Sequence, residues 1–248
     1  TPGAKLSRGY SALYRNGKRL LQQVFTTNAI TPAAGYFSTV LDMAKFISWQ
    51  FRLLEKNQQD ILKSSTLREM QRIQWTSADR KIARGLGFAL STDITGNLTA
   101  GHDGGCPGYS SIVMIEPATK TGISIMVNAQ GVNINKYCNQ ILLLLNKPIP
   151  EDTAGKKIDL SPYEGSYDDY AWSGETAIMP VKGKLMMLSL NSATPANNLK
   201  EFKYISKDTF RRIRPEDGSL AEELIFERNA KGKITRFRLH SSYQVKIN

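Results

Sequence analysis

The sequence has 248 residues, of which 41% are hydrophobic and 22% are charged, an ordinary globular composition with room for one large domain or two modest ones. No apolar run approaches the ~20 residues that a membrane-spanning helix needs, so we expect no membrane span. The formal net charge of +11 makes nucleic acid a candidate ligand, but the basic residues are scattered without interleaved aromatics, so we expect no nucleic-acid binding.

Chain ends and cysteines give little further guidance. The sequence begins at Thr1 without Met or a charged-then-apolar leader, as in a fragment or a processed product. Cys106 and Cys138 are too few for a disulfide framework; one bridge between them stays open, and two free thiols are favoured. With two histidines and no Cys-x-x-Cys pair, we expect neither a metal nor a cofactor.

The first elements expected are a hairpin and a helix. Residues 9–25 alternate around Asn16-Gly17, which is a strong hairpin signal. An amphipathic helix is predicted to run to about Glu55, with Ser38 and Thr39 both able to cap its start. The apolar stripe of that helix comprises Val40, Leu41, Ala44, Ile47, Phe51 and Leu54.

A short helix and a set of strands follow. The helix is expected over residues 65–73. Four strands are expected at 85–92, 97–101, 110–116 and 122–128, the last two as a hairpin. A closing helix over 133–145 has an apolar stripe of Ile134, Tyr137, Ile141 and Leu145.

The clearest boundary in the sequence is at residues 147–152, where two prolines and a polar run follow the closing helix. From about Leu160 onward there is no helical period. Seven short strands recur instead, at 165–170, 176–181, 184–190, 202–205, 209–213, 223–228 and 234–239. Their even spacing predicts a small closed barrel or a sandwich.

The stretch most informative about function runs from Gly101 to Ser111 and holds four glycines between two predicted strands. Such a strand edge lets another molecule approach the backbone, and its N–H groups can bind a substrate oxygen as an oxyanion site does. His102 is the candidate acid–base residue because imidazole titrates near neutral pH. These residues alone fit a catalytic strand and a tight turn with a surface histidine equally well.

Three motifs occur in a fixed order along the first half of the chain. Residues 32–46 read Pro-Ala-Ala-Gly-Tyr-Phe-Ser-Thr-Val-Leu-Asp-Met-Ala-Lys-Phe, and residues 85–88 read Gly-Leu-Gly-Phe. Residues 102–111 read His-Asp-Gly-Gly-Cys-Pro-Gly-Tyr-Ser-Ser. Together they resemble the serine β-lactamase and penicillin-binding-protein family, related to class C β-lactamases, over residues 1–146. The part after residue 160 resembles the β-barrel appended to many members.

This resemblance implies an acyl-serine hydrolase, in which the Ser of a Ser-x-x-Lys motif attacks a carbonyl, helped by the Lys and by the Tyr of a Tyr-x-Asn motif. It implies that His102 is a catalytic residue on the opposite wall of the site. The N–H group of Gly105 would be one donor of the oxyanion hole. The substrate-binding positions implied are Asp103, Gly104, Ala34 and Tyr109; the last is equally well explained as a packed aromatic.

The sequence departs from the family pattern at the nucleophile. No serine has Lys three positions later. Tyr14-Arg15-Asn16 spells Tyr-x-Asn but falls on the predicted hairpin turn, close to His102 for this family, and chance explains it best. We therefore expect the nucleophile in a missing N-terminal segment or on a partner chain, and this chain alone to be inactive.

Asp103 bears on the substrate. A carboxylate beside His102 would repel a penicillin-like carboxylate if it faced the pocket, which favours an esterase or peptidase acting on neutral or amine-bearing substrates over an efficient β-lactamase. Strand alternation makes the opposite orientation equally good. The rival function is a non-catalytic module, derived from this family, that binds cell-wall fragments or another protein; a proteolytic fragment without function is a third alternative.

The predicted fold class is α+β: a partial β-lactamase/transpeptidase-like domain, with an antiparallel sheet and flanking helices, followed by a small all-β lipocalin-like barrel. The predicted domains are 1–147 and 160–248, joined by a linker over 148–159. A partial domain exposes an apolar face, so we expect a partner or self-association to cover it. The resemblance also implies a periplasmic or secreted protein with a small-molecule or peptide substrate.

Overall fold

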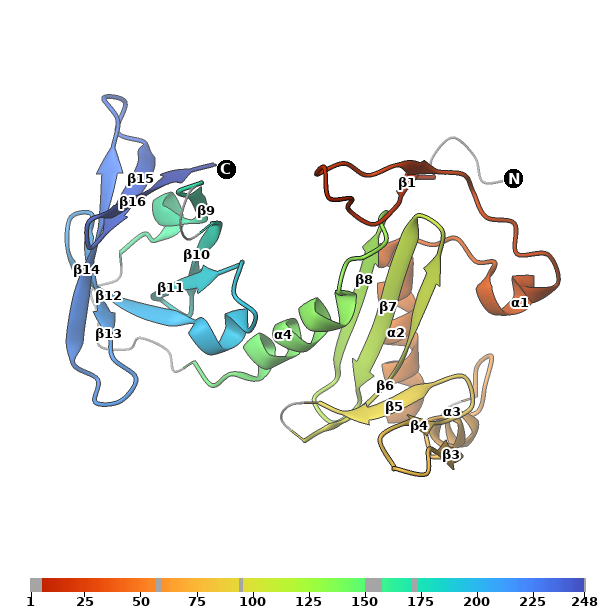
Figure 1. The fold of residues 1–248 in the computed structure, drawn as a ribbon. Coiled ribbons are helices and arrows are strands. Elements are labelled where there is room, and N and C mark those ends of the chain that lie inside the picture. Colours follow the sequence, from red (N-terminus) through yellow and green to blue (C-terminus); the bar gives the residue numbers. More distant parts are fainter. Residues whose placement is uncertain (1–5, 57–58, 94–95, 150–157, 171–173, 248) are drawn as a thin grey trace. The chain divides into compact units, whose positions relative to one another are not determined.

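The computed structural model describes residues 6–56, 59–93, 96–149, 158–170 and 174–247. The chain forms two compact units, Thr1–Leu143 and Leu144–Asn248, each with its own hydrophobic core (Figure 1). Most of the expected linker, residues 150–157, lies outside the described residues.

A short hairpin opens the first unit, as predicted. β1 (Gly9–Tyr10) pairs with β2 (Leu21–Gln22) in antiparallel register. Gly17 makes the turn with a φ of +75°, a conformation that glycine adopts without steric cost, and its N–H donates to the carbonyl of Tyr14 at 3.0 Å. A 3-10 turn η1 (Asn28–Ile30) and a four-residue helix α1 (Thr31–Ala34) follow.

The long amphipathic helix is α2 (Val40–Lys56). Of the two predicted caps, Thr39 is the one used, because the N–H of Asp42 donates to Oγ1 of Thr39 at 3.2 Å. The predicted stripe is partly wrong: Leu41 is 72% exposed, and the buried residues are Ile47, Gln50 and Leu53. Apolar residues occupy two sides of this helix, and the sheet covers only one of them. Helix α3 (Ser64–Met70) ends earlier than expected.

One six-stranded antiparallel sheet forms the centre of this unit, in the order β3-β4-β5-β6-β7-β8. The strands are β3 (Trp75–Thr76), β4 (Ala83–Arg84), β5 (Ala89–Thr92), β6 (Leu98–Cys106), β7 (Tyr109–Glu116) and β8 (Thr121–Val127). The single strand expected over 85–92 is a turn followed by β5, because Gly87 has a φ of +75° and the N–H of Gly85 donates to the carbonyl of Phe88 at 2.9 Å.

Helices cover the two faces of this sheet. Val113 and Ile115 of β7 pack with Ile47 of α2, whereas Ile112 of β7 packs with α4 (Ile134–Asn146). The expected stripe of α4 is wrong beyond its first residue: Ile134, Cys138 and Leu142 are buried, while Tyr137, Ile141 and Leu145 are exposed. Both sets recur every four residues, so the period alone could not tell which of them the sheet covers.

The second unit is the predicted all-β barrel, closed by eight antiparallel strands in the order β10-β11-β12-β13-β14-β15-β16-β9. The strands are β9 (Gly165–Asp168), β10 (Thr176–Val181), β11 (Lys184–Ser189), β12 (Lys200–Ser206), β13 (Thr209–Ile213), β14 (Leu220–Arg228), β15 (Ile234–Leu239) and β16 (Ser242–Lys246). β16 was not predicted, and it closes the barrel by pairing with β9. Two 3-10 turns, η2 (Ser161–Tyr163) and η3 (Pro195–Asn198), flank the strands.

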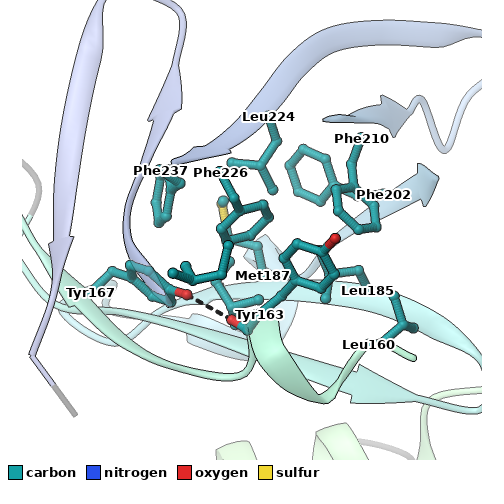
Figure 2. Close-up of a cluster of buried hydrophobic side chains, with 12 residues drawn as sticks. Leu160, Tyr163, Tyr167, Leu185, Met187, Phe202, Phe210, Leu224, Phe226 and Phe237 are labelled. Carbon is teal, nitrogen blue, oxygen red and sulfur yellow. Dashed lines mark hydrogen bonds between the residues drawn. The ribbon is translucent and has the colours of Figure 1, made fainter. Parts of the chain in front are cut away.

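Aromatic rings fill the barrel (Figure 2). Phe226 lies in the middle of this cluster, with its ring centroid 4.8 Å from that of Tyr163, 5.7 Å from that of Phe210 and 5.9 Å from that of Phe237. The hydroxyl of Tyr167, buried in the same core, donates to the carbonyl of Tyr163 at 2.8 Å. The interior is therefore a packed core.

Candidate functional site

The glycine-rich stretch forms the far half of β6, where the strand loses one of its two neighbours. β5 pairs with β6 only over residues 98–101. β7 continues alongside β6 to the end, where Cys106 pairs with Tyr109. Among the described strands, none pairs with the other edge of residues 102–106. Backbone N–H and C=O groups on this open edge are accessible to another molecule.

His102 and Asp103 point to opposite faces of the sheet. His102 lies opposite Val113, and Asp103 lies opposite Ile112. Directly opposed residues in an antiparallel pair share a face. Val113 belongs to the core beneath α2, and Ile112 belongs to the core beneath α4. The structure therefore does not bring the two side chains together, because successive residues of a strand alternate.

The imidazole of His102 is exposed, and its environment selects a tautomer. Nδ1 lies 2.6 Å from the backbone oxygen of Asp103. A carbonyl oxygen only accepts hydrogen bonds, so Nδ1 carries a proton and donates it. In the neutral ring the lone pair is then on Nε2. This nitrogen is the one able to accept a proton or a hydrogen bond from a ligand.

Gly104 and Gly105 leave the strand bare on both faces. A Cβ added to Gly104 would lie 2.8 Å from Oγ of Ser111, its partner on β7. A Cβ added to Gly105 would have its nearest neighbour, the carbonyl oxygen of Tyr109, at 4.0 Å. Packing within the chain therefore does not require glycine at position 105, and the effect of glycine there is to keep the strand accessible.

Asp103 borders a small cavity of about 150 Å³ on the α4 face. Ser91, Thr99 and Asn135 also line it. The hydroxyls of Ser91 and Thr99 lie 2.8 Å apart and hydrogen-bond to each other. His102 also borders this cavity, although the strand register puts its side chain on the opposite face from the Asp103 carboxylate.

Tyr109 follows the β6–β7 turn and holds the N-terminal segment against it. Its hydroxyl donates to the carbonyl of Ser7 at 2.7 Å. A Cβ on Gly9 would lie 2.7 Å from the Tyr109 ring, so this position accommodates only glycine without a shift. The N–H of Tyr10 lies 3.2 Å from the carbonyl of Gly108. Tyr109 is thus a packed aromatic that also lines a groove of about 670 Å³.

Ala34 and the Tyr-x-Asn match lie elsewhere. Ala34 is exposed and ends α1, and this helix lies apart from β6 in Figure 1. The structure therefore does not bring Ala34 to the His102 strand. Tyr14 is at the hairpin turn, where its N–H donates to the carbonyl of Lys18 at 2.9 Å, and its side chain is 52% exposed.

Both cysteines are free thiols. Cys106 is half-buried at the end of β6, beside Gly105, and burial raises its pKa. Burial raises the pKa of the Cys138 thiol to about 11. A raised pKa disfavours the thiolate, which is the nucleophilic form. Neither cysteine is therefore an activated nucleophile.

No pattern in the sequence indicates the groove beside Tyr109. Its walls come from the segment around Arg8, from β2 and from Tyr109, which are far apart in sequence. The one residue type related to this packing is the glycine at position 9, where a side chain would collide with the Tyr109 ring. Among the described residues, no group of three His, Cys, Asp or Glu side chains could hold a metal ion. No helix in the described part is long and apolar enough to cross a membrane.

Comparison with known proteins gives a family for the first unit. A family model described as Beta-lactamase matches residues 2–146. Among solved structures, the chain is similar to the octameric penicillin-binding protein homologue from Pyrococcus abyssi, at 17% identity, with 97% of this chain and 53% of that chain covered and a TM-score of 0.45. It is also similar to SurE, at 18% identity, with 100% of this chain and 58% of that chain covered and a TM-score of 0.37.

A third structure is a D-stereospecific amidohydrolase from Streptomyces sp., at 25% identity, with 51% of this chain and 36% of that chain covered and a TM-score of 0.38. The chain spans about half the length of the first two solved structures. No curated protein matches it.

Proposed function

The chain belongs to the beta-lactamase family, and from this membership we propose that it forms the C-terminal part of a serine hydrolase domain that works through an acyl-enzyme. The observation that carries the proposal is the open edge of β6. His102, Gly104 and Gly105 lie there, exposed, on a strand paired on one side only.

Each residue on this edge has a proposed role. Nε2 of His102 accepts a proton or a hydrogen bond at the reacting group, because Nδ1 is engaged by the Asp103 carbonyl. The N–H of Gly105 donates to the oxyanion that develops when a carbonyl is attacked. Gly104 lets the substrate backbone approach, Tyr109 borders the site, and Ala34 is retained as a substrate contact that α1 would have to bring closer.

The nucleophile is proposed to lie outside this chain, in an N-terminal segment or on a partner, since no serine here has Lys three residues later. Exposed apolar side chains on α2 support a missing neighbour. Val40 is 45% exposed, Leu41 is 72% exposed and Phe46 is 41% exposed. We propose that the segment carrying the nucleophile, or self-association of this chain, covers them.

The proposed substrates are small esters and peptides. The position of Asp103 on the α4 face removes the charge repulsion that would exclude a carboxylate at His102. Turnover of a short-chain ester and of a cephalosporin by the natural protein containing this chain tests the proposal. Without that repulsion the site should accept the cephalosporin as well as the ester, and Asp103→Asn should leave the ratio of the two rates unchanged. Hydrolysis of neither substrate would contradict the serine-hydrolase proposal, and a ratio changed by Asp103→Asn would contradict the orientation assigned to Asp103.

A second candidate function is a non-catalytic module that binds cell-wall fragments or another protein. The absence of Ser-x-x-Lys from these 248 residues favours it. It predicts that the natural protein hydrolyses neither substrate yet retains peptidoglycan in a pull-down experiment. A periplasmic or secreted location is part of both proposals, and cell fractionation tests it.

A further inference from the structure

The hairpin formed by β3 and β4 lies at the outer edge of the six-stranded sheet, because β3 is the last strand on that side (Figure 1). Its two faces differ. Ala83 of β4 packs against the core beneath α2, and Thr76 of β3 is opposite it. Trp75 and Arg84 form the neighbouring pair, so they lie on the other face of the hairpin. On this face Trp75 is 57% exposed.

Apolar side chains gather on and beside this open face. Ile82 belongs to it, because Ser77 and Ile82 form the next pair after Thr76, and the N–H of Ser77 donates to the carbonyl of Ile82 at 2.9 Å. Ile82 is 45% exposed. Ile73, just before β3, is 59% exposed, and Leu86, just after β4, is 52% exposed. Single exposed apolar residues are ordinary, but such a group on one short hairpin indicates an interaction surface.

The turn between the two strands is held in one conformation. Oγ of Ser77 donates to the Asp79 carboxylate at 2.6 Å and accepts from the N–H of Ile82 at 3.0 Å. The N–H of Lys81 donates to the same carboxylate at 3.2 Å. Arg80 has a φ of +57°, and its N–H donates to the carbonyl of Ser77 at 2.9 Å. The hairpin is therefore ordered before any partner arrives, which lowers the entropic cost of binding.

The same hairpin is positively charged. Residues 72–84 hold four basic residues, Arg72, Arg80, Lys81 and Arg84, and one acidic residue, Asp79, so four minus one leaves a net charge of +3. The ion pair between Lys81 and Asp79, at 3.5 Å, is exposed on both sides and neutralises little of this charge. The surface thus combines an exposed tryptophan and other apolar side chains with a basic surround.

This combination matches the headgroup region of a membrane that contains anionic lipids. Tryptophan favours that region, because its ring is apolar and its indole N–H is polar. Basic residues near such a surface are attracted by the lipid phosphates. A second copy of this chain is a poorer occupant, since it would bring a like charge of +3 to the same surface and the whole chain carries +11.

We propose that the β3–β4 hairpin attaches this protein to the surface of a membrane containing anionic lipids. Trp75 and Ile82 enter the boundary between the headgroups and the acyl chains, while Arg80, Lys81 and Arg84 contact lipid phosphates. The inference does not rest on the proposed hydrolase function, because the hairpin shares no residue with the open edge of β6.

Co-sedimentation of the full chain with phospholipid vesicles tests the proposal. Vesicles of phosphatidylcholine alone are compared with vesicles of an equimolar mixture of phosphatidylcholine and phosphatidylglycerol. The mixed vesicles should bind at least about tenfold tighter, because each basic residue near an anionic surface contributes about fivefold. Added salt should weaken this binding, since it screens the charges.

Two charge variants separate the hairpin from the general charge of the chain. Arg80→Gln with Lys81→Gln should weaken binding to the mixed vesicles about 20-fold, as the loss of two contacting charges predicts. Arg15→Gln with Lys18→Gln removes the same charge from exposed positions at the other hairpin turn. This control should weaken binding less than about threefold, through the net charge alone.

Two aromatic variants test insertion. Trp75→Gln should weaken binding to the mixed vesicles about tenfold, because a large apolar ring no longer leaves water. Tyr14→Gln, at a position that is 52% exposed on the other hairpin, should bind as the wild-type does. Tryptophan emission should shift to the blue on binding in the wild-type, and the shift should be absent from Trp75→Gln. Far-UV circular dichroism reports that each variant is folded.

Three results would overturn the inference: equal binding to the two kinds of vesicle, an equal loss in the two charge variants, or wild-type binding by Trp75→Gln. The second would mean diffuse attraction by net charge. A chain that binds no vesicles but forms a dimer in sedimentation velocity, lost in Trp75→Gln, would also overturn it and make a second copy the occupant. None of these measurements involves turnover, so the hydrolase proposal keeps its own test.

Discussion

Gly122 on β8 lies directly against Ile47 on α2, so that a Cβ on the glycine would be only 2.3 Å from Cγ2 of the isoleucine. Ile47 is buried and β-branched, and its side chain therefore cannot rotate away at low cost. Gly122→Ala should push α2 off the sheet and lower the free energy of unfolding of the first unit by about 1–3 kcal/mol. Denaturant titration followed by circular dichroism measures it.

Gly105→Ala is the matched control for this prediction. The nearest atom to a Cβ at position 105 is at 4.0 Å, so this variant should unfold at nearly the wild-type denaturant concentration. Equal stability of Gly122→Ala and wild-type would show that α2 does not pack as closely as the structure has it.

Phe226 tests the barrel core. It is 2% exposed and contacts several other rings (Figure 2). Phe226→Ala should cost about 3–5 kcal/mol of barrel stability, because it removes a large side chain and leaves a cavity. Tyr243→Ala, at a position that is 43% exposed, should cost less than about 1 kcal/mol. Hydrogen exchange of the barrel amides, read by mass spectrometry, compares the two; similar losses would argue against a packed interior.

Asp208 links the barrel's stability to pH. Hydrogen bonds from Arg228, at 2.8 to 3.1 Å, hold the pKa of Asp208 below its usual value, and the hydroxyl of Tyr163 adds a further bond at 2.9 Å. A folded-state pKa below the unfolded one stabilises the barrel at neutral pH. That stability disappears as the pH falls from the unfolded pKa of about 4 through the folded value.

Asp208→Asn should therefore lower the free energy of unfolding by about 1 kcal/mol at pH 7, a value reduced by partial exposure of the pair. The difference from wild-type should shrink below pH 4. Glu216→Gln removes an exposed carboxylate and changes the net charge by the same amount as Asp208→Asn. It should change the free energy of unfolding little at either pH. A difference that grows on acidification would contradict the assigned direction of the shift.

His102 and His240 form a natural pair for testing catalysis, since they are the two histidines of the chain. In the natural protein, His102→Asn should reduce kcat/KM for an ester by about 10²- to 10⁴-fold, the usual contribution of a general acid–base group. His240→Asn alters only the barrel and should leave kcat/KM near wild-type. Comparable values for the two variants would remove His102 from the mechanism.

Much of the fold could be predicted from local patterns. The Asn16-Gly17 turn, the Thr39 cap and most barrel strands follow from residue types that specify a backbone conformation. Which face of each helix is buried was harder to predict. Leu41 and Tyr137 are apolar at helical spacing yet exposed, because a helix with two apolar sides does not reveal which side the sheet covers.

The sequence indicated which residues form the candidate site, but not how strand pairing arranges them in space. The glycine pattern identified His102 and Gly105 as a group, but the length of β5, which leaves their strand edge open, depends on pairing. Alternation could not orient Asp103 until the register with β7 was known. The contact between Tyr109 and Ser7 joins residues distant in sequence, and no local pattern indicates it.

We propose that this chain supplies one wall of the site and that the nucleophile lies outside it. Covalent labelling of the natural protein with a fluorophosphonate probe, followed by peptide mass mapping, locates the reactive serine. We expect a single labelled serine in a Ser-x-x-Lys sequence outside these 248 residues, with weaker labelling in His102→Asn. A labelled serine within this chain, or a natural protein that never labels, would contradict it.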